Sequence, residues 1–213
     1  MKHMANLTEI SKFLQQGRAP KVKELVSAAL QEGVPAKEIL ESGLLDGMSV
    51  IGEKFKNNQV FVPEVLIAAR AMNAGLEILK PYLANAGVEE KGVAVIGTVK
   101  GDLHDIGKNL VKMMMEGKGL KVIDLGVDVS AEAYVQAAID NHAQLICCSA
   151  LLTTTMNEMK NVVDLVNQSE LHGKVKIMVG GAPVTQTFCE SIGADCYTPD
   201  AASAADAALE LCS

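Results

Sequence analysis

Five short apolar runs alternate with helical patterns between residues 92 and 213, and this alternation constrains the fold more than any other feature. The runs lack polar alternation, which is typical of parallel strands buried on both faces of a sheet. Five successive strand–helix units predict an α/β fold, a doubly wound, Rossmann-like domain with a five-stranded parallel sheet. The expected strands are Val93–Val99, Leu120–Leu125, Leu145–Ser149, Val175–Val179 and a weak one at Asp195–Tyr197. The expected helices are Ile106–Gly117, Ala131–Asn141, Thr155–Gln168, Val184–Ile192 and Ala201–Leu211.

The first part of the chain carries helical patterns only. Prolines 20, 35 and 63 each fall in the first turn of an expected helix, where a missing N–H costs little. Pro81 is expected to kink or end the last of these helices. Four helices joined by short turns predict a small bundle. We therefore expect an N-terminal four-helix bundle over residues 1–88 and the α/β domain over residues 89–213.

Composition excludes several classes of function. The net charge is -7, with 11 basic and 11 acidic side chains in residues 1–91 against 8 and 15 in the remainder, which disfavours binding to nucleic acid or to anionic membranes. No apolar stretch approaches the roughly 18–20 residues of a membrane span. An odd number of cysteines, five, without a CxxC spacing, fits buried thiols better than disulfides or a zinc site. We expect a cytoplasmic protein.

Three loops that follow expected strands have unusual content. They are residues 100–107 after the first strand, 149–155 after the third and 180–183 after the fourth. Ligands of doubly wound sheets bind beyond the carboxyl ends of the strands, where the strand order reverses. None of the loops carries a GxGxxG or GxxxxGK[ST] motif, which disfavours ordinary nucleotide binding.

His104 is the histidine that stands in these loops. A lone histidine is more often a loop residue that is hydrogen-bonded to the backbone. Asp102, however, is close enough in sequence to bond one imidazole nitrogen, which leaves the other free for a metal. Zinc is disfavoured, because its sites use about three or four protein ligands. A single ligand suits a metal already held by a macrocycle, which needs only an axial donor.

The threonine run 153–155 has two explanations. It precedes an expected helix, so simple N-capping is one of them. Thr155 is also placed to hydrogen-bond Asp102. Gly107 and the pair Gly180-Gly181 leave room for a bulky group by removing side chains.

These motifs together resemble the cobalamin-binding signature of the methionine synthase and corrinoid methyltransferase family, which includes the methanol- and methylamine-type corrinoid proteins. Residues 92–129 and 145–160 resemble that family almost throughout. The N-terminal bundle resembles the family's helical cap, so the resemblance covers nearly the whole chain. The matching motifs are Asp102-x-His104-x-x-Gly107, Ser149-x-Leu151-x-Thr153, Gly180-Gly181, Leu45-Asp46-Gly47-Met48, Phe61-Val62-Pro63 and Ala69-Arg70-Ala71-Met72.

The resemblance implies a role for each matching residue. His104 would be the lower axial ligand of cobalt, replacing the cofactor's own base in a base-off, His-on complex. Asp102 and a hydroxyl would complete a proton relay with it; methionine synthase has a serine where this chain has Thr155. The bundle would cover the upper face of the cofactor. The implied cobalamin-binding residues are Gly101, Asp102, His104, Asp105, Ile106, Gly107, Ser149, Leu151, Thr153, Gly180 and Gly181, with Phe55, Val62 and Val65 in the cap.

The resemblance also implies a reaction and its partners. A corrinoid carrier shuttles a methyl group through methylcobalamin and cob(I)alamin states, with cob(II)alamin as an accidental oxidation product. The chain ends where the cobalamin domain is complete, which leads us to expect a free-standing carrier. Its implied partners are a substrate-specific methyltransferase, an acceptor methyltransferase that uses tetrahydrofolate or coenzyme M, and a corrinoid reductive activation protein.

Two other classes share parts of this pattern. A cobalamin-dependent sensor or regulator would combine the bundle and the α/β domain, but it should also carry a basic DNA-binding module, and residues 1–91 are neutral. The small subunit of an adenosylcobalamin mutase shares the DxHxxG motif, but it usually lacks this cap. Retention of methylcobalamin against adenosylcobalamin separates these classes.

Overall fold

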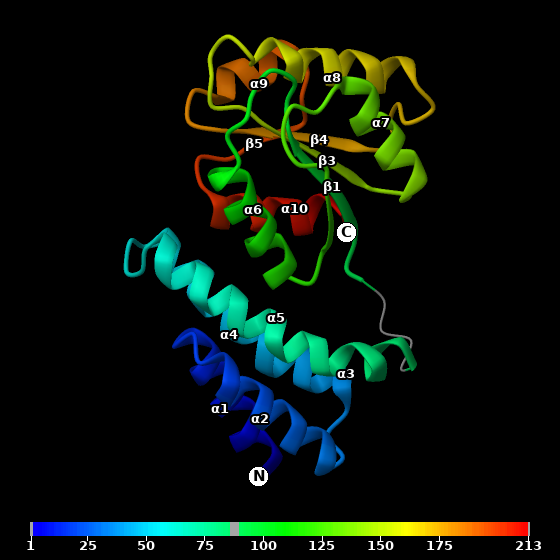
Figure 1. Ribbon diagram of the computed structural model, residues 1–213. Helices are drawn as coiled ribbons and strands as arrows, with labels where there is room; N and C mark the ends of the chain where they lie inside the picture. The colour runs from blue at the N-terminus through cyan, green and yellow to red at the C-terminus, as the bar shows by residue number, and fades with distance from the viewer. Residues whose placement is uncertain (1, 86–89, 213) are drawn as a thin grey trace. The chain divides into compact units, whose positions relative to one another are not determined.

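The computed structural model describes residues 2–85 and 90–212, with side chains for residues 7–83 and 90–212. The chain divides into two compact units, Met1–Glu89 and Glu90–Ser213 (Figure 1). The boundary predicted from the sequence, between residues 88 and 89, lies outside the described residues.

The described part of the N-terminal unit is helical, as predicted. Its third helix is continuous but contains a π-helical segment, so three consecutive elements form one of the four expected helices. The third helix consists of α3 Ala36–Ile39, η1 Leu40–Leu45 and α4 Asp46–Lys56. The other helices are α1 Lys2–Gln15, α2 Ala19–Gln31 and α5 Val62–Asn85.

Close helix packing in this unit relies on small residues. A Cβ atom built on Gly47 of α4 would lie 3.0 Å from the Cα atom of Ser11 in α1, so glycine lets these two helices approach. Gly75 of α5 has the same role against Leu44 and Val22. The helices bury an apolar core that includes Ile10, Leu14, Val22, Val26, Ile39, Leu44, Met48, Ile51, Met72 and Leu79.

Pro81 was expected to kink or end the last helix, and the ending is wrong, because α5 continues through Pro81 to Asn85. Proline removes one N–H, the one that would bond the carbonyl group of Glu77. Both residues are exposed, so water can bond that carbonyl group. A proline within the last turn of a long helix therefore costs little of the helix's hydrogen bonding.

The C-terminal unit contains a five-stranded parallel sheet in the order β2-β1-β3-β4-β5, which confirms the predicted doubly wound fold. Every predicted strand and helix is present, with ends that move by two residues at most. The elements are β1 Val93–Thr98, α6 Ile106–Gly117, β2 Lys121–Asp124, α7 Ala131–Asp140, β3 Leu145–Ser149, α8 Asn157–Gln168, β4 Lys176–Gly180, α9 Gln186–Ile192, β5 Cys196–Tyr197 and α10 Ala201–Leu211.

Helices cover both faces of this sheet (Figure 1). Helices α6 and α10 pack together on one face, and α7, α8 and α9 lie on the other. The latter face holds a core that includes Val95, Tyr134, Ile146, Val162, Ile177 and Val179. The strand order reverses between β1 and β3, because β2 lies on one side of β1 and β3 on the other. Proteins of this fold class bind ligands in a crevice where the strand order reverses, so a ligand is expected at the carboxyl ends of β1 and β3.

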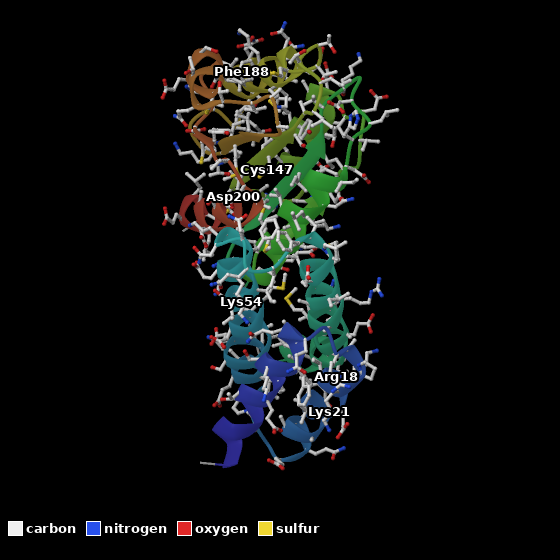
Figure 2. All side chains as sticks on the ribbon, turned by 90° about the vertical axis from the view of Figure 1, so that its left-hand side faces the viewer. Arg18, Lys21, Lys54, Cys147, Phe188 and Asp200 are labelled. Carbon is white, nitrogen blue, oxygen red and sulfur yellow. The ribbon has the colours of Figure 1, made fainter. Side chains whose placement is uncertain are left out.

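The cysteines are free, and three of them are buried. Cys147 and Cys148 lie in β3, as the apolar run predicted; Figure 2 labels Cys147. Burial raises the pKa of the Cys148 thiol to about 12, although the neighbouring Tyr134 side chain lowers it in part. These thiols are therefore uncharged at neutral pH and act as small core side chains.

Within residues 2–85 and 90–212, no helix is both long and apolar enough to cross a membrane.

Candidate functional site

Asp102 is the centre of a hydrogen-bond network at the carboxyl ends of β1 and β3. Its side chain is fully buried, yet both carboxylate oxygens accept several hydrogen bonds. Oδ1 accepts from the Nδ1 atom of His104 at 2.7 Å and from the His104 backbone N–H at 3.1 Å. Oδ2 accepts from the backbone N–H groups of Leu151 at 2.8 Å and Leu152 at 3.1 Å. The aspartate thus connects the loop after β1 to the loop after β3.

Asp102 is ionised at neutral pH. Burial by itself raises the pKa of this carboxyl group. Hydrogen bonds from the His104 side chain and from the backbone N–H groups of Leu151, His104 and Leu152 outweigh burial and hold the pKa well below its usual range. A buried carboxylate with this many donors fixes their positions, because each donor would be unsatisfied without it.

Thr155 supplies a further donor to the same carboxylate. Its hydroxyl group is 3.0 Å from Oδ2 of Asp102 and 2.9 Å from the carbonyl oxygen of Leu152. The single hydroxyl proton can serve only one of these acceptors at a time. The structure therefore places His104, Asp102 and Thr155 in one continuous chain of hydrogen bonds.

Thr155 does not cap the following helix, so the capping explanation of the threonine run is wrong for this residue. Helix α8 begins at Asn157, and Met156 occupies the N-cap position without a side-chain hydrogen bond. The hydroxyl group is directed instead to Asp102 and to its own turn. The helix starts two residues later than predicted, because residues 151–156 form turns around the buried carboxylate.

His104 has one fixed and one available ring nitrogen. Nδ1 bonds Asp102, and half of the side chain (51%) is exposed. Among the described residues, no hydrogen bond occupies Nε2. The backbone of His104 is held as well, since the buried hydroxyl group of Thr98 donates to its carbonyl oxygen at 2.8 Å. The imidazole is thus oriented from one side and free to bind on the other.

Exposed apolar side chains lie in the two loops that Asp102 connects, at the start of α6 and in the loop after β2. Large apolar side chains rarely gather on a surface without a ligand or partner. Their exposure reaches 70% for Leu103 and 76% for Ile106. The set, which we call the apolar rim, is Leu103, Ile106, Val127, Leu151 and Leu152.

Two of the predicted glycines leave open space and one does not. A Cβ atom built on Gly107 or Gly180 would meet nothing within 4 Å. Gly181 has a φ of 131°, and a Cβ atom there would lie 1.9 Å from the carbonyl oxygen of Ala150. Gly180 therefore keeps space open at the end of β4, whereas Gly181 allows the loop after β4 to contact the loop after β3.

The remaining predicted residues of the α/β unit lie at the same edge of the sheet. Ser149 of β3 is in register with Thr98 of β1 and with Gly180 of β4, so these three form a row across the central strands. Thr153 is exposed in the turn after β3. Gly101, with a φ of 79°, and the exposed Asp105 flank the Asp102–His104 segment.

The three predicted cap residues belong to the N-terminal unit. Phe55 lies in the last turn of α4 and is half-buried. Val62 and Val65 lie in the first turn of α5, the former half-buried and the latter fully buried. All three flank the turn between α4 and α5. Their role toward the α/β unit remains a prediction.

Sequence analysis missed a buried lysine in this region. Lys108 of α6 has a side chain that is only 2% exposed, and its Nζ atom is 2.6 Å from Asp124 at the end of β2. The same Nζ donates to Asn109 at 2.7 Å, and Asn109 donates to Asp105 at 3.0 Å. One signal was available, since Lys108 lies seven residues before the buried Met115, on the apolar face of the helix.

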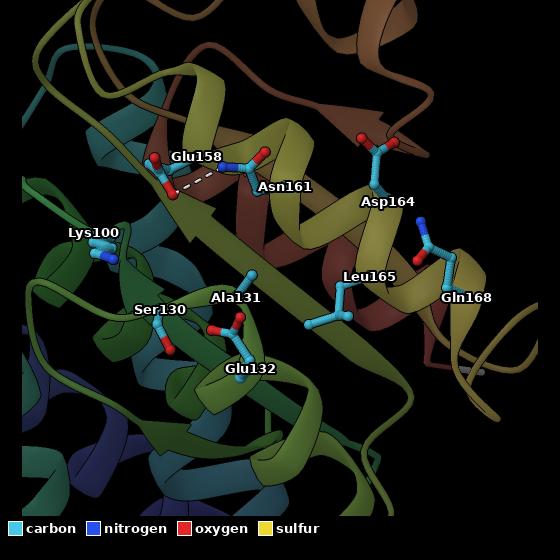
Figure 3. A pocket seen from close by; sticks show the side chains of 9 residues that line it. All are labelled: Lys100, Ser130, Ala131, Glu132, Glu158, Asn161, Asp164, Leu165 and Gln168. Atoms are coloured by element: carbon cyan, nitrogen blue, oxygen red, sulfur yellow. Dashed lines mark hydrogen bonds between the residues drawn. The ribbon is translucent and has the colours of Figure 1, made fainter.

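A separate hollow of about 350 Å³ lies between α7 and α8 (Figure 3). Its lining is polar and carries three carboxylates, Glu132, Glu158 and Asp164, with Lys100 at one end. Asn161 donates a hydrogen bond to Glu158 across 3.0 Å. None of the predicted site residues lines this hollow, so we place the functional site at the carboxyl ends of β1 and β3.

Comparisons with known proteins agree over both units. A family model described as a B12 binding domain matches residues 92–209, and a second model with that description matches residues 7–80. Dimethylamine corrinoid protein 3 of Methanosarcina acetivorans is 42% identical over 206 residues, which are 96% of each chain.

Solved structures give the same result. A chain of the methanol:cobalamin methyltransferase complex MtaBC from Methanosarcina barkeri matches with a TM-score of 0.86 and 31% identity, over 97% of this chain and 80% of that chain. A cobalamin-binding protein from Desulfitobacterium hafniense DCB-2 matches with a TM-score of 0.79 and 28% identity, over 96% of this chain and 98% of that chain.

Proposed function

Because the chain belongs to the B12-binding family of corrinoid proteins, as its motifs predicted, we propose that it is a methyl carrier that holds cobalamin through His104. The observation that supports this role most directly is the state of the His104 ring. Its Nδ1 atom is fixed by a buried carboxylate, and its Nε2 atom is available within the apolar rim.

The residues present fit a corrinoid. The macrocycle is broad and largely apolar on its face, and the apolar rim offers a matching surface around one nitrogen donor. The open space at Gly107 and Gly180 leaves room for a bulky group beside that surface. A single protein ligand is sufficient, because the macrocycle supplies the equatorial ones.

A corrinoid held through His104 would supply the methyl-transfer chemistry, with its cobalt as the carrier of the methyl group. The residues around His104 set its orientation and its protonation as the lower ligand. Asp102 holds the proton of His104 on Nδ1, which leaves Nε2 unprotonated and able to coordinate. When Nε2 is not coordinated it is a free acceptor, so release of the ligand favours uptake of a proton by the His104–Asp102 pair. Thr155 adjusts to that change by donating its proton to Asp102 or to the carbonyl oxygen of Leu152.

The N-terminal unit serves as the cap in this proposal. Phe55 and Val62 are partly exposed beside one turn of the bundle and would cover the upper face of the cofactor, whereas Val65 is fully buried beside the same turn. Removing the Phe55 side chain should then speed photolysis of bound methylcobalamin. An unchanged photolysis rate in Phe55→Ala would exclude this shielding role.

The partners follow from the carrier role. The matches to a methanol:cobalamin methyltransferase complex and to methylamine corrinoid proteins favour a place in a methyltransferase system over a regulator or a mutase subunit. We propose that one methyltransferase loads the carrier from its substrate and that another unloads it to tetrahydrofolate or coenzyme M. A reductive activation protein would restore the carrier after accidental oxidation to cob(II)alamin.

Electron paramagnetic resonance of the cob(II)alamin form tests the lower ligand. The full chain is reconstituted anaerobically with hydroxocobalamin, reduced, and measured with and without nitrogen-15 in its histidines. We expect the nitrogen splitting of the cobalt signal to change on labelling, because a histidine replaces the cofactor's own base. The change should be absent in His104→Ala.

Matched controls are available in the same unit. His142 and His172 are exposed in loops of the α/β unit away from the site, so His142→Ala and His172→Ala should retain the labelled splitting. Retained cofactor with a splitting that does not respond to labelling would remove His104 from the role of ligand. Failure to retain any cobalamin would overturn the whole proposal.

A further inference from the structure

Asp128, in the loop after β2, contacts the loop after β1 at two points. Its carboxylate Oδ1 accepts a hydrogen bond from the backbone N–H of Gly101 at 2.7 Å. Its own backbone N–H donates to the carbonyl oxygen of Asp102 at 3.0 Å. The two bonds bracket the Gly101–Asp102 segment, which carries the carboxylate that orients His104.

The backbone conformation of Asp128 suits few residues. Its φ is 54°, in the left-handed region where aspartate, asparagine and glycine are tolerated best. Gly101 is also left-handed, with a φ of 79°. Two such residues facing each other form a tight junction between the loops.

The loop that carries Asp128 is itself anchored. Asp124 accepts hydrogen bonds from the buried Lys108 at 2.6 Å and from the backbone N–H of Gly126 at 3.0 Å. The carbonyl oxygen of Gly126 accepts from the backbone N–H of Thr98 at 3.0 Å. Asp128 therefore extends from a fixed support rather than from a free loop.

We propose that Asp128 is a positioning residue for His104, acting through the backbone of Gly101 and Asp102. This inference rests on the proposed role of His104 as the lower ligand. Asp102 can bond His104 and the loop after β3 together only while its own backbone is held in place. Without the Asp128 carboxylate, the Gly101 N–H loses its acceptor and the segment gains freedom. His104 then spends less time with Nδ1 on Asp102 and Nε2 directed outward.

Three substitutions separate the carboxylate from the backbone conformation. Asp128→Asn keeps an acceptor oxygen and tolerates the left-handed backbone, so it should behave as the unchanged chain. Asp128→Gly keeps the backbone conformation but has no acceptor. Asp128→Ala has no acceptor and none of glycine's flexibility, so a loss shared by Gly and Ala reports on the acceptor. His142→Gly is the control, because His142 is also left-handed, with a φ of 50°, and lies in another loop.

The first readout needs no cofactor. Long-range proton–nitrogen correlation spectra of the apoprotein, at about pH 8 where a free imidazole is neutral, report which nitrogen of His104 carries the proton. We expect Nδ1–H in the unchanged chain, in Asp128→Asn and in His142→Gly. In Asp128→Gly and Asp128→Ala the equilibrium should shift about fivefold toward the other tautomer, the change expected for one lost hydrogen bond.

The second readout is the labelled cob(II)alamin spectrum described above. The histidine-bound share of the signal should fall in Asp128→Gly and Asp128→Ala and remain in Asp128→Asn. If both readouts are the same in all variants as in the unchanged chain, Asp128 has no positioning role, although His104 can still be the ligand. If the unchanged chain lacks the histidine splitting, the proposed function fails, and the inference that depends on it fails too.

Discussion

The two units of this chain differ in what they bury. Among the described residues, the buried polar or charged side chains are Ser11, Thr98, Asp102, Lys108 and Thr155. Only Ser11 belongs to the helical unit, and its partner Asp46, at 3.1 Å, is exposed. The other four lie in the α/β unit, at the carboxyl ends of the strands or in the first turn of α6. The helical unit thus has an ordinary apolar core, whereas the α/β unit buries polar groups in one place.

Burial of a charged group is costly unless it is paired and hydrogen-bonded. The α/β unit meets this requirement with backbone donors from two loops and with Lys108, so its buried charges fix loop geometry as well as contribute stability. The helical unit has no such network of buried charges among its described residues. The position of buried polar groups, more than the size of either core, therefore marks the functional part of the chain.

The largest difference in stability loss should appear between substitutions of two aspartates, one in each unit. Asp102→Ala removes an acceptor from several buried donors and should destabilise the α/β unit by about 4 kcal/mol. Asp46→Ala, in the helical unit, should cost less than about 1 kcal/mol because Asp46 is exposed. Hydrogen exchange measured by mass spectrometry reports each unit separately. Equal losses of protection in the two variants would contradict the comparison.

The same aspartate predicts a pH dependence. The pKa of Asp102 is held below its usual value, so the folded state binds its proton less tightly than the unfolded state. The stabilisation is fully present above the unfolded pKa, about 3.9, and is lost as the pH falls below that value toward the folded pKa. Protection of the α/β unit against hydrogen exchange should therefore decrease as the pH falls below about 4. This dependence of protection on pH should be absent in Asp102→Asn.

Substitution of the neighbouring Gly180 and Gly181 should give the next largest difference in stability loss. In Gly181→Ala the new Cβ atom would meet the Ala150 carbonyl oxygen at 1.9 Å on a backbone that disfavours alanine, so the α/β unit should lose about 3 kcal/mol. Gly180→Ala meets nothing within 4 Å, so its stability should change by less than about 0.5 kcal/mol. Its added methyl group lies where the cofactor is proposed to bind, and the affinity for cobalamin should fall. Unchanged affinity in Gly180→Ala would argue against a cofactor beside β4.

Two lysines that contact one carboxylate differ in burial, and their removal should differ in its effect on stability. Lys108 is buried and Lys112 is 30% exposed, and both contact Asp124. Lys108→Met should cost about 2 kcal/mol, less than a fully buried pair because Asp124 is partly exposed. Lys112→Met should cost less than about 1 kcal/mol. Burial raises the pKa of Asp124, but the hydrogen bond and charge of Lys108, together with the hydrogen bonds from the Gly126 backbone N–H and from Lys112, lower it below its usual value. Carbon-13 titration should therefore show a higher Asp124 pKa in Lys108→Met, and no rise would exclude the pair as its cause.

The smallest loss of stability is expected for a substitution in the helical unit. Ser11→Ala removes one hydrogen bond to an exposed aspartate and should cost less than about 1 kcal/mol. Hydrogen exchange in α1 and α4 checks it. A loss as large as that of Asp102→Ala would mean that the helical unit also depends on buried polar contacts.

The sequence predicted the α/β unit well because its strands are short apolar runs bounded by helices of the usual length. The register of β1, β3 and β4 places Thr98, Ser149 and Gly180 in one row, which no local pattern contains. Motif spacing identified Asp102 and His104, and their bond joins residues only two apart. Leu152 and Asp128 were missed, because Leu152 donates through its backbone N–H and the Asp128 carboxylate accepts from the backbone N–H of Gly101. A backbone donor has no signature in the side-chain sequence.

What the sequence determined by itself is local or periodic. It determined the five strand–helix units, the helical first part and the Asp102–His104 pair, since hydrophobic periodicity and short spacing act within a few residues. Tertiary structure decided which loops meet that pair. Leu151, Leu152 and Thr155 lie about fifty residues beyond Asp102 and reach it because parallel pairing aligns the carboxyl ends of β1 and β3. Only this convergence supplies enough donors to keep a carboxylate charged without contact with water, and that charge holds the histidine in place.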